Sequence, residues 1–243
     1  STRKESSAAS DVYKRQMKQM GFGSLYDVAD VVTYKPEKSW NYEVGAHLST
    51  PSHKVQADLA LFYIDCRDQQ LTVFPEGQVT GRLMTNAGRT RSFGGEASLL
   101  ATLWRNLDLQ VAYGYTRATF VKFDTGKADY AGNFIPYAPQ HTLYAGASYT
   151  LRTGWNWLEY VIFRVAANGA GRIYWNEANT FSQPFYALLE ASIRFEHRHW
   201  AVDVWGRNLT DTRYDTFYFM SIGNSFLQRG RPRTFGVSLS ITL

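Results

Sequence analysis

The chain has 243 residues, of which 44% are hydrophobic and 16% aromatic, and its formal net charge is +5 at pH 7. No apolar run approaches the roughly 18 residues of a membrane-spanning helix, so any membrane crossing must use strands closed into a barrel. Basic and acidic residues are interspersed, which argues against a nucleic-acid groove and against a polybasic membrane anchor. The single Cys66 cannot form an intrachain disulfide, and it has no metal or catalytic spacing.

The beginning of the chain differs from the rest. Residues 1–16 have no apolar period, no initiating Met and no apolar core of a signal peptide. They resemble the peptide that arises when sequencing-adapter DNA is translated, so we expect 1–16 to be a non-native leader and the chain to begin in the middle of a gene. Residues 17–39 are expected to form an irregular lead-in to a β-barrel portion over residues 40–243.

From residue 40 onward, apolar and polar residues alternate in nine segments, a pattern that predicts β-strands. The expected strands are 40–49, 55–66, 92–104, 109–123, 139–152, 157–169, 185–196, 200–208 and 232–243. From Phe235 to Leu243 every second residue is large and apolar. Strands of about 10 residues match the tilted span of a bilayer, whereas strands of soluble domains average about 5 to 6 residues.

Tight gaps alternate with long gaps between these segments. The tight gaps are 50–54, 105–108, 153–156 and 197–199, and the long gaps are 67–91, 124–138, 170–184 and 209–231. Short turns on one rim and long loops on the other are typical of an outer-membrane β-barrel, whose long loops face outside. Five tryptophans beside strand ends are expected to form an aromatic girdle at the short-turn rim: Trp40, Trp104, Trp155, Trp157 and Trp200. The alternative is that they seal the core of a soluble β-rich binding domain.

Four motifs follow one another along the chain. They are Tyr34-Lys35-Pro36-Glu37 before Trp40, Asn86-Ala87-Gly88 with Gly94-Gly95-Glu96, Asn208-Leu209-Thr210-Asp211 with Tyr214, and Gly230-Arg231-Pro232-Arg233. In this order they resemble the motifs of TonB-dependent outer-membrane receptors. Asn208 and Asp211 are expected to form a turn in which side-chain oxygens accept backbone N–H groups. Pro232 is expected at a strand start, where losing a donor costs least. The family usually ends on an aromatic residue, whereas this chain ends on Leu243.

The resemblance implies an all-β fold, in which the chain is the C-terminal portion of an antiparallel transmembrane barrel of 22 strands. A plug domain, a TonB-binding segment and a signal peptide are then expected upstream. It also implies import of a scarce nutrient, foremost a ferric siderophore, through the outer membrane of a Gram-negative bacterium. The expected partners are outer-membrane lipid, the TonB complex, the barrel-insertion machinery through the last strand, and the nutrient. The alternative is a complete small barrel with an adhesin or structural role, against which the odd strand number argues.

The long loops are rich in aromatic and hydrogen-bonding residues. The candidate ligand-contacting residues are Tyr130, Tyr137, Arg172, Tyr174, Trp175, Tyr214 and Tyr218. Aromatic surface combined with Arg suits an anionic, ring-bearing ligand. The same side chains are also of the kind that packs loops together.

Neither catalysis nor a metal site is indicated by the sequence. His47 and His141 have no neighbouring nucleophile motif such as Gly-x-Ser-x-Gly. His197 and His199 lie in a short turn with no third ligand nearby. Asn208 begins a glycosylation sequon, which the turn explains without a glycan. We therefore predict a protein that is not an enzyme and that holds no metal or cofactor.

Overall fold

The structure is a computed structural model that describes residues 36–73, 83–104, 106–124, 128–221 and 224–242. The predicted leader at 1–16 and residues 17–35 of the predicted lead-in lie outside these ranges. Within the described residues, no helix is long and apolar enough to cross a membrane.

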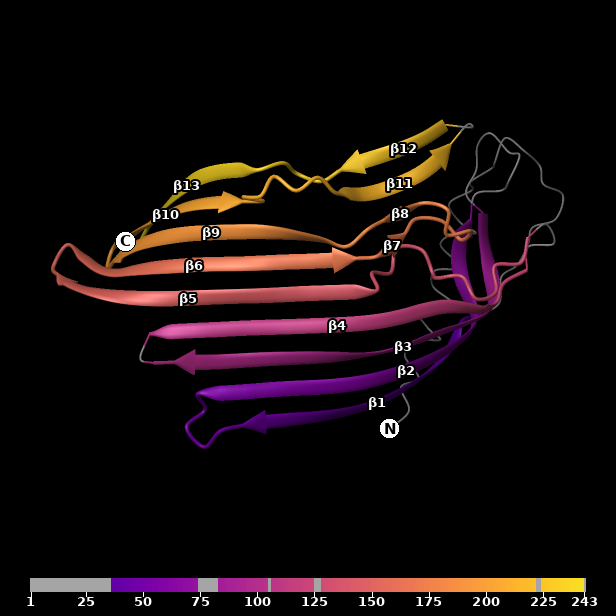
Figure 1. Cartoon of the computed structure of the whole chain (residues 1–243), viewed down its shortest axis with the longest axis horizontal. Coiled ribbons are helices and arrows are strands. Elements are labelled where there is room, and N and C mark those ends of the chain that lie inside the picture. The colour runs from indigo at the N-terminus through magenta and orange to yellow at the C-terminus, as the bar shows by residue number, and fades with distance from the viewer. Residues whose placement is uncertain (1–35, 74–82, 105, 125–127, 222–223, 243) are drawn as a thin grey trace.

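Nine antiparallel strands form one sheet in the order β1-β2-β3-β4-β5-β6-β9-β10-β13, which confirms the predicted fold class and all nine predicted strands. They are β1 (Lys38–Ser49), β2 (Val55–Val73), β3 (Leu83–Leu103), β4 (Leu107–Lys122), β5 (His141–Trp155), β6 (Leu158–Gly171), β9 (Tyr186–His197), β10 (Trp200–Arg207) and β13 (Thr234–Ile241). The tight turns lie at the left of Figure 1 and the long connections at the right. Because β1 and β13 are the two edges of this sheet, the described residues form an open section of barrel wall.

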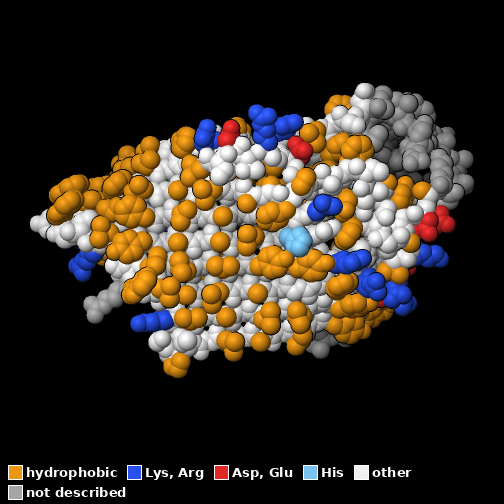
Figure 2. Space-filling model, in the orientation of Figure 1, with side chains coloured by type: hydrophobic (Ala, Val, Ile, Leu, Met, Phe, Trp, Pro, Cys, Tyr) orange, Lys and Arg blue, Asp and Glu red, His pale blue; other side chains and the backbone are white. Residues whose placement is uncertain are grey.

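One face of the sheet is apolar from edge to edge. Residues directly opposite each other on neighbouring strands share a face. Val204 of β10 is opposite both Ile193 of β9 and Val237 of β13, so these three apolar side chains lie on the same face. These side chains remain exposed, to 68% at Val237 and 66% at Val44 on the other edge. Rows of apolar side chains cover this face in Figure 2. An apolar face of this size that stays exposed is expected for a lipid-facing wall and not for a soluble domain.

Three of the four predicted long loops contain strand structure that the sequence did not predict. β2 and β3 stay paired from Arg67–Arg89 to Val73–Leu83, so most of the predicted loop 67–91 is a hairpin. Alternation is lost there because the strands have left the apolar band, and Asp68, with φ of 54°, interrupts the pairing. The other two loops hold the short pairs β7 (Ile173–Tyr174) with β8 (Ser182–Gln183), and β11 (Asp215–Ser221) with β12 (Asn224–Arg229).

The predicted position at the short-turn rim is confirmed for four of the five tryptophans. Trp104, Trp155, Trp157 and Trp200 lie at the tight-turn ends of their strands, where Trp155 and Trp157 stack with ring centroids 5.3 Å apart. The placement of Trp40 is wrong, because it pairs with Asp65 at the end of β1 that faces the long loops. The direction of β1 decides this: the strand begins at the long-loop rim and ends at the turn 50–54.

Substituting Arg for neighbouring residues of β1 tests the assignment of the two faces. Val44 is on the apolar face and Glu43 on the other, so Val44→Arg places a charge in lipid and Glu43→Arg does not. We expect Val44→Arg to lower the free energy of unfolding of the full-length protein by about 2–4 kcal/mol, and Glu43→Arg to change it little. Urea unfolding in lipid vesicles measures both. Equal losses would contradict the face assignment.

Candidate functional site

The most deeply buried aromatic residues of the described chain lie at the long-loop rim. Phe120 at the end of β4 is 1% exposed and Phe123 is 3% exposed, with ring centroids 4.9 Å apart. The β4–β5 loop (residues 123–140) folds back over them, with Tyr130 packed 5.6 Å from Phe123. The Phe120 amide donates to the Asn133 carbonyl, which fixes the fold-back. Tyr130 therefore belongs to the packing of its own loop.

Two asparagines join this loop to the β6–β9 loop (residues 172–185). Asn179 Oδ1 accepts from the Phe134 amide at 2.7 Å, and its Nδ2 donates to the Phe134 carbonyl at 2.9 Å. Asn133 Nδ2 donates to the Glu177 carbonyl at 2.9 Å. The Phe134 ring also stacks on Tyr174, with centroids 5.3 Å apart. Because backbone and side chain are both paired, the two loops form one packed unit.

Tyr137 is the point at which three long loops meet. Its ring lies 5.4 Å from Trp175 of the β6–β9 loop and 5.7 Å from Phe217 of the β10–β13 loop (residues 208–233). Its hydroxyl donates to the Tyr218 carbonyl at 2.7 Å, and its amide donates to the Tyr174 carbonyl at 2.8 Å. Despite these contacts Tyr137 is 46% exposed. A rigidly held aromatic ring thus remains accessible at the rim.

The other candidate residues differ in how much surface they present. Trp175 is 7% exposed and Tyr218 is 6% exposed, and Tyr218 stacks on Phe181 at 4.6 Å. Tyr214 stacks on Tyr186 at 4.5 Å. Arg172 is exposed. The structure therefore brings Tyr137, Tyr174, Trp175 and Tyr218 together, and places Tyr130 and Tyr214 in adjacent packing units.

Some residues that hold this rim together were missed by the sequence analysis. Gln183 is 6% exposed, and its Oε1 accepts from the Asp215 amide at 2.8 Å, which joins the β6–β9 loop to the β10–β13 loop. Asn179 and Phe181 act in the same way in the contacts described above. In the sequence, these three residues could be recognised only as polar or aromatic loop residues. Their role in joining loops could not be predicted, because their partners lie tens of residues away in the sequence.

The Asn-Leu-Thr-Asp motif forms the turn that the sequence predicted. Asn208 is 4% exposed with φ of 50°, and its Oδ1 accepts from the Thr212 amide at 2.8 Å. Its Nδ2 donates to the carbonyls of Thr212 and Arg231. Asp211 Oδ1 accepts from the Arg233 amide at 3.0 Å. The motif therefore ties the exit of β10 to the segment that leads through Pro232 into β13.

The remaining motif residues have structural positions as well. The Tyr214 ring covers Gly230, where an added Cβ would lie 2.1 Å from the ring. The Leu209 amide donates to the Leu189 carbonyl at 2.8 Å. Pro36 and Glu37 stand directly before β1, so the strand begins two residues earlier than predicted, at Lys38.

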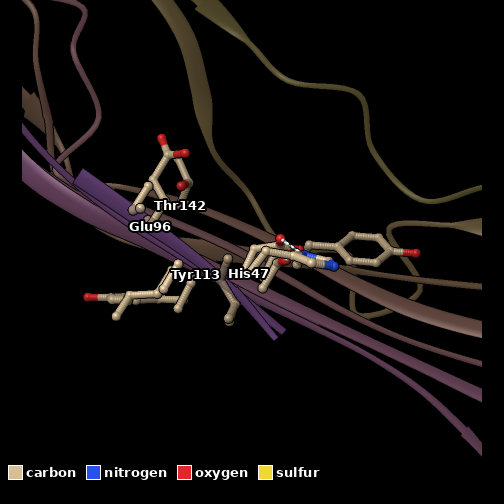
Figure 3. Close-up of a pocket in the computed structure, with 15 residues that line it drawn as sticks. His47, Glu96, Tyr113 and Thr142 are labelled. Atoms are coloured by element: carbon tan, nitrogen blue, oxygen red, sulfur yellow. Dashed lines mark hydrogen bonds and ion pairs between the residues drawn. The ribbon is translucent and has the colours of Figure 1, made fainter. Parts of the chain in front are cut away.

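The inner face of the sheet is polar. A hollow of about 640 Å³ over β1 to β5 contains His47 and Asp58, whose Nδ1 and Oδ1 are 2.6 Å apart. Glu96 and Thr142 lie on the same side of the sheet, whereas Tyr113 lies on the other (Figure 3). Farther along, Arg194 pairs with Glu196 and Asp203, each at 2.7 Å. Such a surface suits a water-filled or plugged lumen.

The histidines form no metal site in the described part of the chain. His197 and His199 have ring centroids 5.9 Å apart in a tight turn, and His197 stacks on Trp200. No group of three or more His, Cys, Asp or Glu in the described ranges is placed to hold a metal ion.

An open wall with an exposed apolar face, a polar inner face and unequal rims defines a section of an outer-membrane β-barrel. The family model "TonB dependent receptor-like, beta-barrel" matches residues 9–209, and the chain belongs to this family of Gram-negative outer-membrane receptors. The chain is 28% identical over 218 residues to the pesticin receptor of Yersinia pestis. The matched region makes up 87% of this chain and 30% of the pesticin receptor. It thus spans about 30% of the length of such curated relatives.

Solved structures show the same likeness. The ferric yersiniabactin uptake receptor FyuA of Yersinia pestis matches with a TM-score of 0.71 and 25% identity, over 84% of this chain and 30% of FyuA. The ferric preacinetobactin receptor BauA of Acinetobacter baumannii matches with a TM-score of 0.64 and 19% identity, over 85% of this chain and 30% of BauA. At 19% identity, the likeness to BauA is a likeness of fold alone.

Asn208 offers a graded test of the turn. Asn208→Ala removes all three hydrogen bonds and leaves buried backbone groups unpaired, so we expect a loss of about 1–3 kcal/mol in unfolding free energy. Asn208→Asp keeps the acceptor and loses the donors, so its loss is expected to be smaller. Urea unfolding of the full-length receptor measures both, with the exposed Thr210→Ala as control. A loss in the control equal to that of Asn208→Ala would refute the role of Asn208.

Glu177 makes the joined loops sensitive to pH. Burial raises the pKa of its carboxyl, because desolvation penalises the charged form. Protonated Glu177 therefore contributes to the stability of the loops, and this contribution is fully present at pH values below the pKa of the carboxyl in the unfolded chain. The contribution is lost as the pH rises through the raised pKa of the folded state. We expect Glu177→Gln to slow proteolysis of the β6–β9 loop relative to wild type at about pH 7.5, and to have no effect near pH 4. The ratio of cleavage rates at each pH is the measurement, and an unchanged ratio would contradict the prediction.

Proposed function

We propose that this chain is the C-terminal barrel portion of a receptor that imports a ferric siderophore, with energy delivered through the TonB complex. The observation that carries the proposal is the meeting of three long loops at Tyr137 on the rim that faces outside the cell. FyuA, by its name, takes up ferric yersiniabactin, and BauA is a receptor for ferric preacinetobactin. Since the chain spans about 30% of such proteins, the remaining part would supply the plug and further ligand contacts.

Within this rim we propose that Tyr137 and Arg172 touch the ligand. Both are exposed, and aromatic surface combined with a guanidinium suits a large anionic complex that carries rings. The other five candidates would position the loops: Tyr130, Tyr174, Trp175, Tyr214 and Tyr218. Ligand affinity then depends on rings that are ordered before binding, because ordering them during binding would cost free energy.

The remaining partners follow from the same proposal. Lipid would cover the apolar face, the TonB complex would act on an upstream segment, and the barrel-insertion machinery would act on β13 (Thr234–Ile241). No catalytic step, cofactor or nucleic acid enters this function. A small adhesin or structural barrel would require a closed sheet, whereas the described sheet ends in two edges.

Replacing the exposed tyrosine tests the ligand site. Tyr137→Ala in the full-length receptor is expected to weaken binding of radiolabelled ferric yersiniabactin about tenfold, because it removes a rigid aromatic contact. Tyr149→Ala is the matched control, since Tyr149 is 44% exposed but lies toward the tight turns on the lipid-facing side. Binding and uptake by cells measure both variants. Equal losses would refute the Tyr137 site, and a wild-type receptor that imports no ferric siderophore would refute the function.

A further inference from the structure

The two proposed ligand contacts come from different loops, Tyr137 from the β4–β5 loop and Arg172 from the β6–β9 loop. These loops lie side by side and run in opposite directions. The Gln140 amide donates to the Arg172 carbonyl at 3.0 Å, and three residues earlier the Tyr137 amide donates to the Tyr174 carbonyl at 2.8 Å. We call this line of contacts the loop seam. The loop seam therefore sets the position of Arg172 relative to Tyr137.

Asn179 closes the loop seam at the end opposite to Gln140 and Arg172. Its Oδ1 accepts from the Phe134 amide at 2.7 Å, and its Nδ2 donates to the Phe134 carbonyl at 2.9 Å. One side chain thus satisfies both backbone groups of Phe134, as a neighbouring strand would. The Phe134 ring stacks on Tyr174, between this pairing and the Tyr137 hydrogen bond.

The partner of Asn179 is itself held by the wall. Phe134 forms a bridge with Thr119 of β4, and the hydrogen bonds of this bridge come from the residues on either side of Phe134. In an antiparallel pair the backbone groups of successive residues point to opposite sides, so those of Phe134 point away from β4. They point to Asn179 instead. Asn179 therefore ties the β6–β9 loop to a segment that β4 fixes in place.

The backbone at this position suits asparagine. Asn179 has φ of 55°, in the left-handed region that Asn adopts more readily than most residues other than Gly. Its Nδ2 also donates to the Asn176 carbonyl at 3.0 Å. Asn176 in turn accepts the amides of Thr180 and Phe181, which gives the loop its own shape. Asn176 acts within the β6–β9 loop, whereas Asn179 places this loop against the β4–β5 loop.

We propose that Asn179 is a positioning residue for ligand binding, which keeps the loop seam closed so that Arg172 has a fixed place relative to Tyr137. The inference rests on the proposed function and states how that site is ordered before the ligand arrives. With the loop seam open, only a fraction of receptors would have both groups in place, and the apparent affinity would fall by that fraction. Asn179 acts through the loops and not by touching the ligand.

Asn179→Gly removes the side chain without straining the backbone, because Gly also adopts positive φ. In the full-length receptor it is expected to weaken binding of radiolabelled ferric yersiniabactin about tenfold. Thr180→Gly is the matched control, since it adds the same flexibility one residue later and keeps the Asn179 side chain. It is expected to change the affinity less than about twofold. Equal losses in the two variants would overturn the proposal.

A double-mutant cycle separates positioning from a general loss of structure. Arg172→Ala alone is expected to weaken binding about tenfold, as for a direct contact. If Asn179 acts by placing Arg172, adding Asn179→Gly to Arg172→Ala is expected to weaken binding less than about twofold further, because coupled residues are not additive. Fully additive losses would contradict the positioning role. If Asn179→Gly does not fold, as judged by heat-modifiable gel migration, Asn179→Asp enters the same cycle, since it keeps the acceptor and loses the donor.

Amide hydrogen exchange of the ligand-free receptor tests the loop seam directly. Asn179→Gly is expected to raise the exchange rate of the Tyr137 amide about tenfold, because the Tyr174 carbonyl protects this amide only while the loop seam is closed. Thr180→Gly is expected to leave it unchanged. Faster exchange confined to the Phe134 amide would show that Asn179 acts only locally, and would overturn the proposal. A wild-type receptor that binds no ferric siderophore would refute the proposed function, and the exchange of Tyr137 would still decide whether Asn179 holds the loops together.

Discussion

The rest of the structure depends on the need to pair every backbone N–H and C=O within the bilayer, where no water is available. The wall meets this need with nine strands in antiparallel register from β1 to β13. Register also decides which side chains meet lipid, because a slip of one residue would turn each strand's apolar row toward the lumen. The alignment of Ile193, Val204 and Val237 on one face therefore depends on the backbone register as well as on the apolar type of these residues.

Outside the bilayer the loops must be ordered by side chains. Asn179 pairs with both backbone groups of Phe134, Gln183 joins two loops, and Asn208 ties the exit of β10 to the entry of β13. Aromatic stacking adds packing where the wall offers no enclosed core. These contacts hold Tyr137 in one position while its ring stays half exposed. An ordered but accessible rim is the arrangement that ligand capture at a cell surface requires.

Charge is distributed according to the surroundings of each surface. On the inner face, Arg194 is balanced by Glu196 and Asp203. Within the apolar band, the outward-facing positions of the described strands are free of Asp, Glu, Lys and Arg, as the cost of burying a charge in lipid demands. At its long-loop boundary, Arg67 lies over the Trp40 ring and Arg117 over the Phe134 ring. The distribution of charged residues on this sheet therefore differs between the inner face, the apolar band and the long-loop boundary.

The sequence by itself determined the strands, the inequality of the rims and the family, because two-residue alternation, gap lengths and the motif around Asn208 are local properties. It did not reveal the pairing of β2 and β3 beyond Cys66, since polar strands outside the bilayer lose the alternation. It misplaced Trp40, because a single strand does not show which rim it starts from. The meeting of three loops at Tyr137, and of Arg67, Arg91 and Arg117 on one face, was decided only by the tertiary structure, because register brings together residues tens of positions apart.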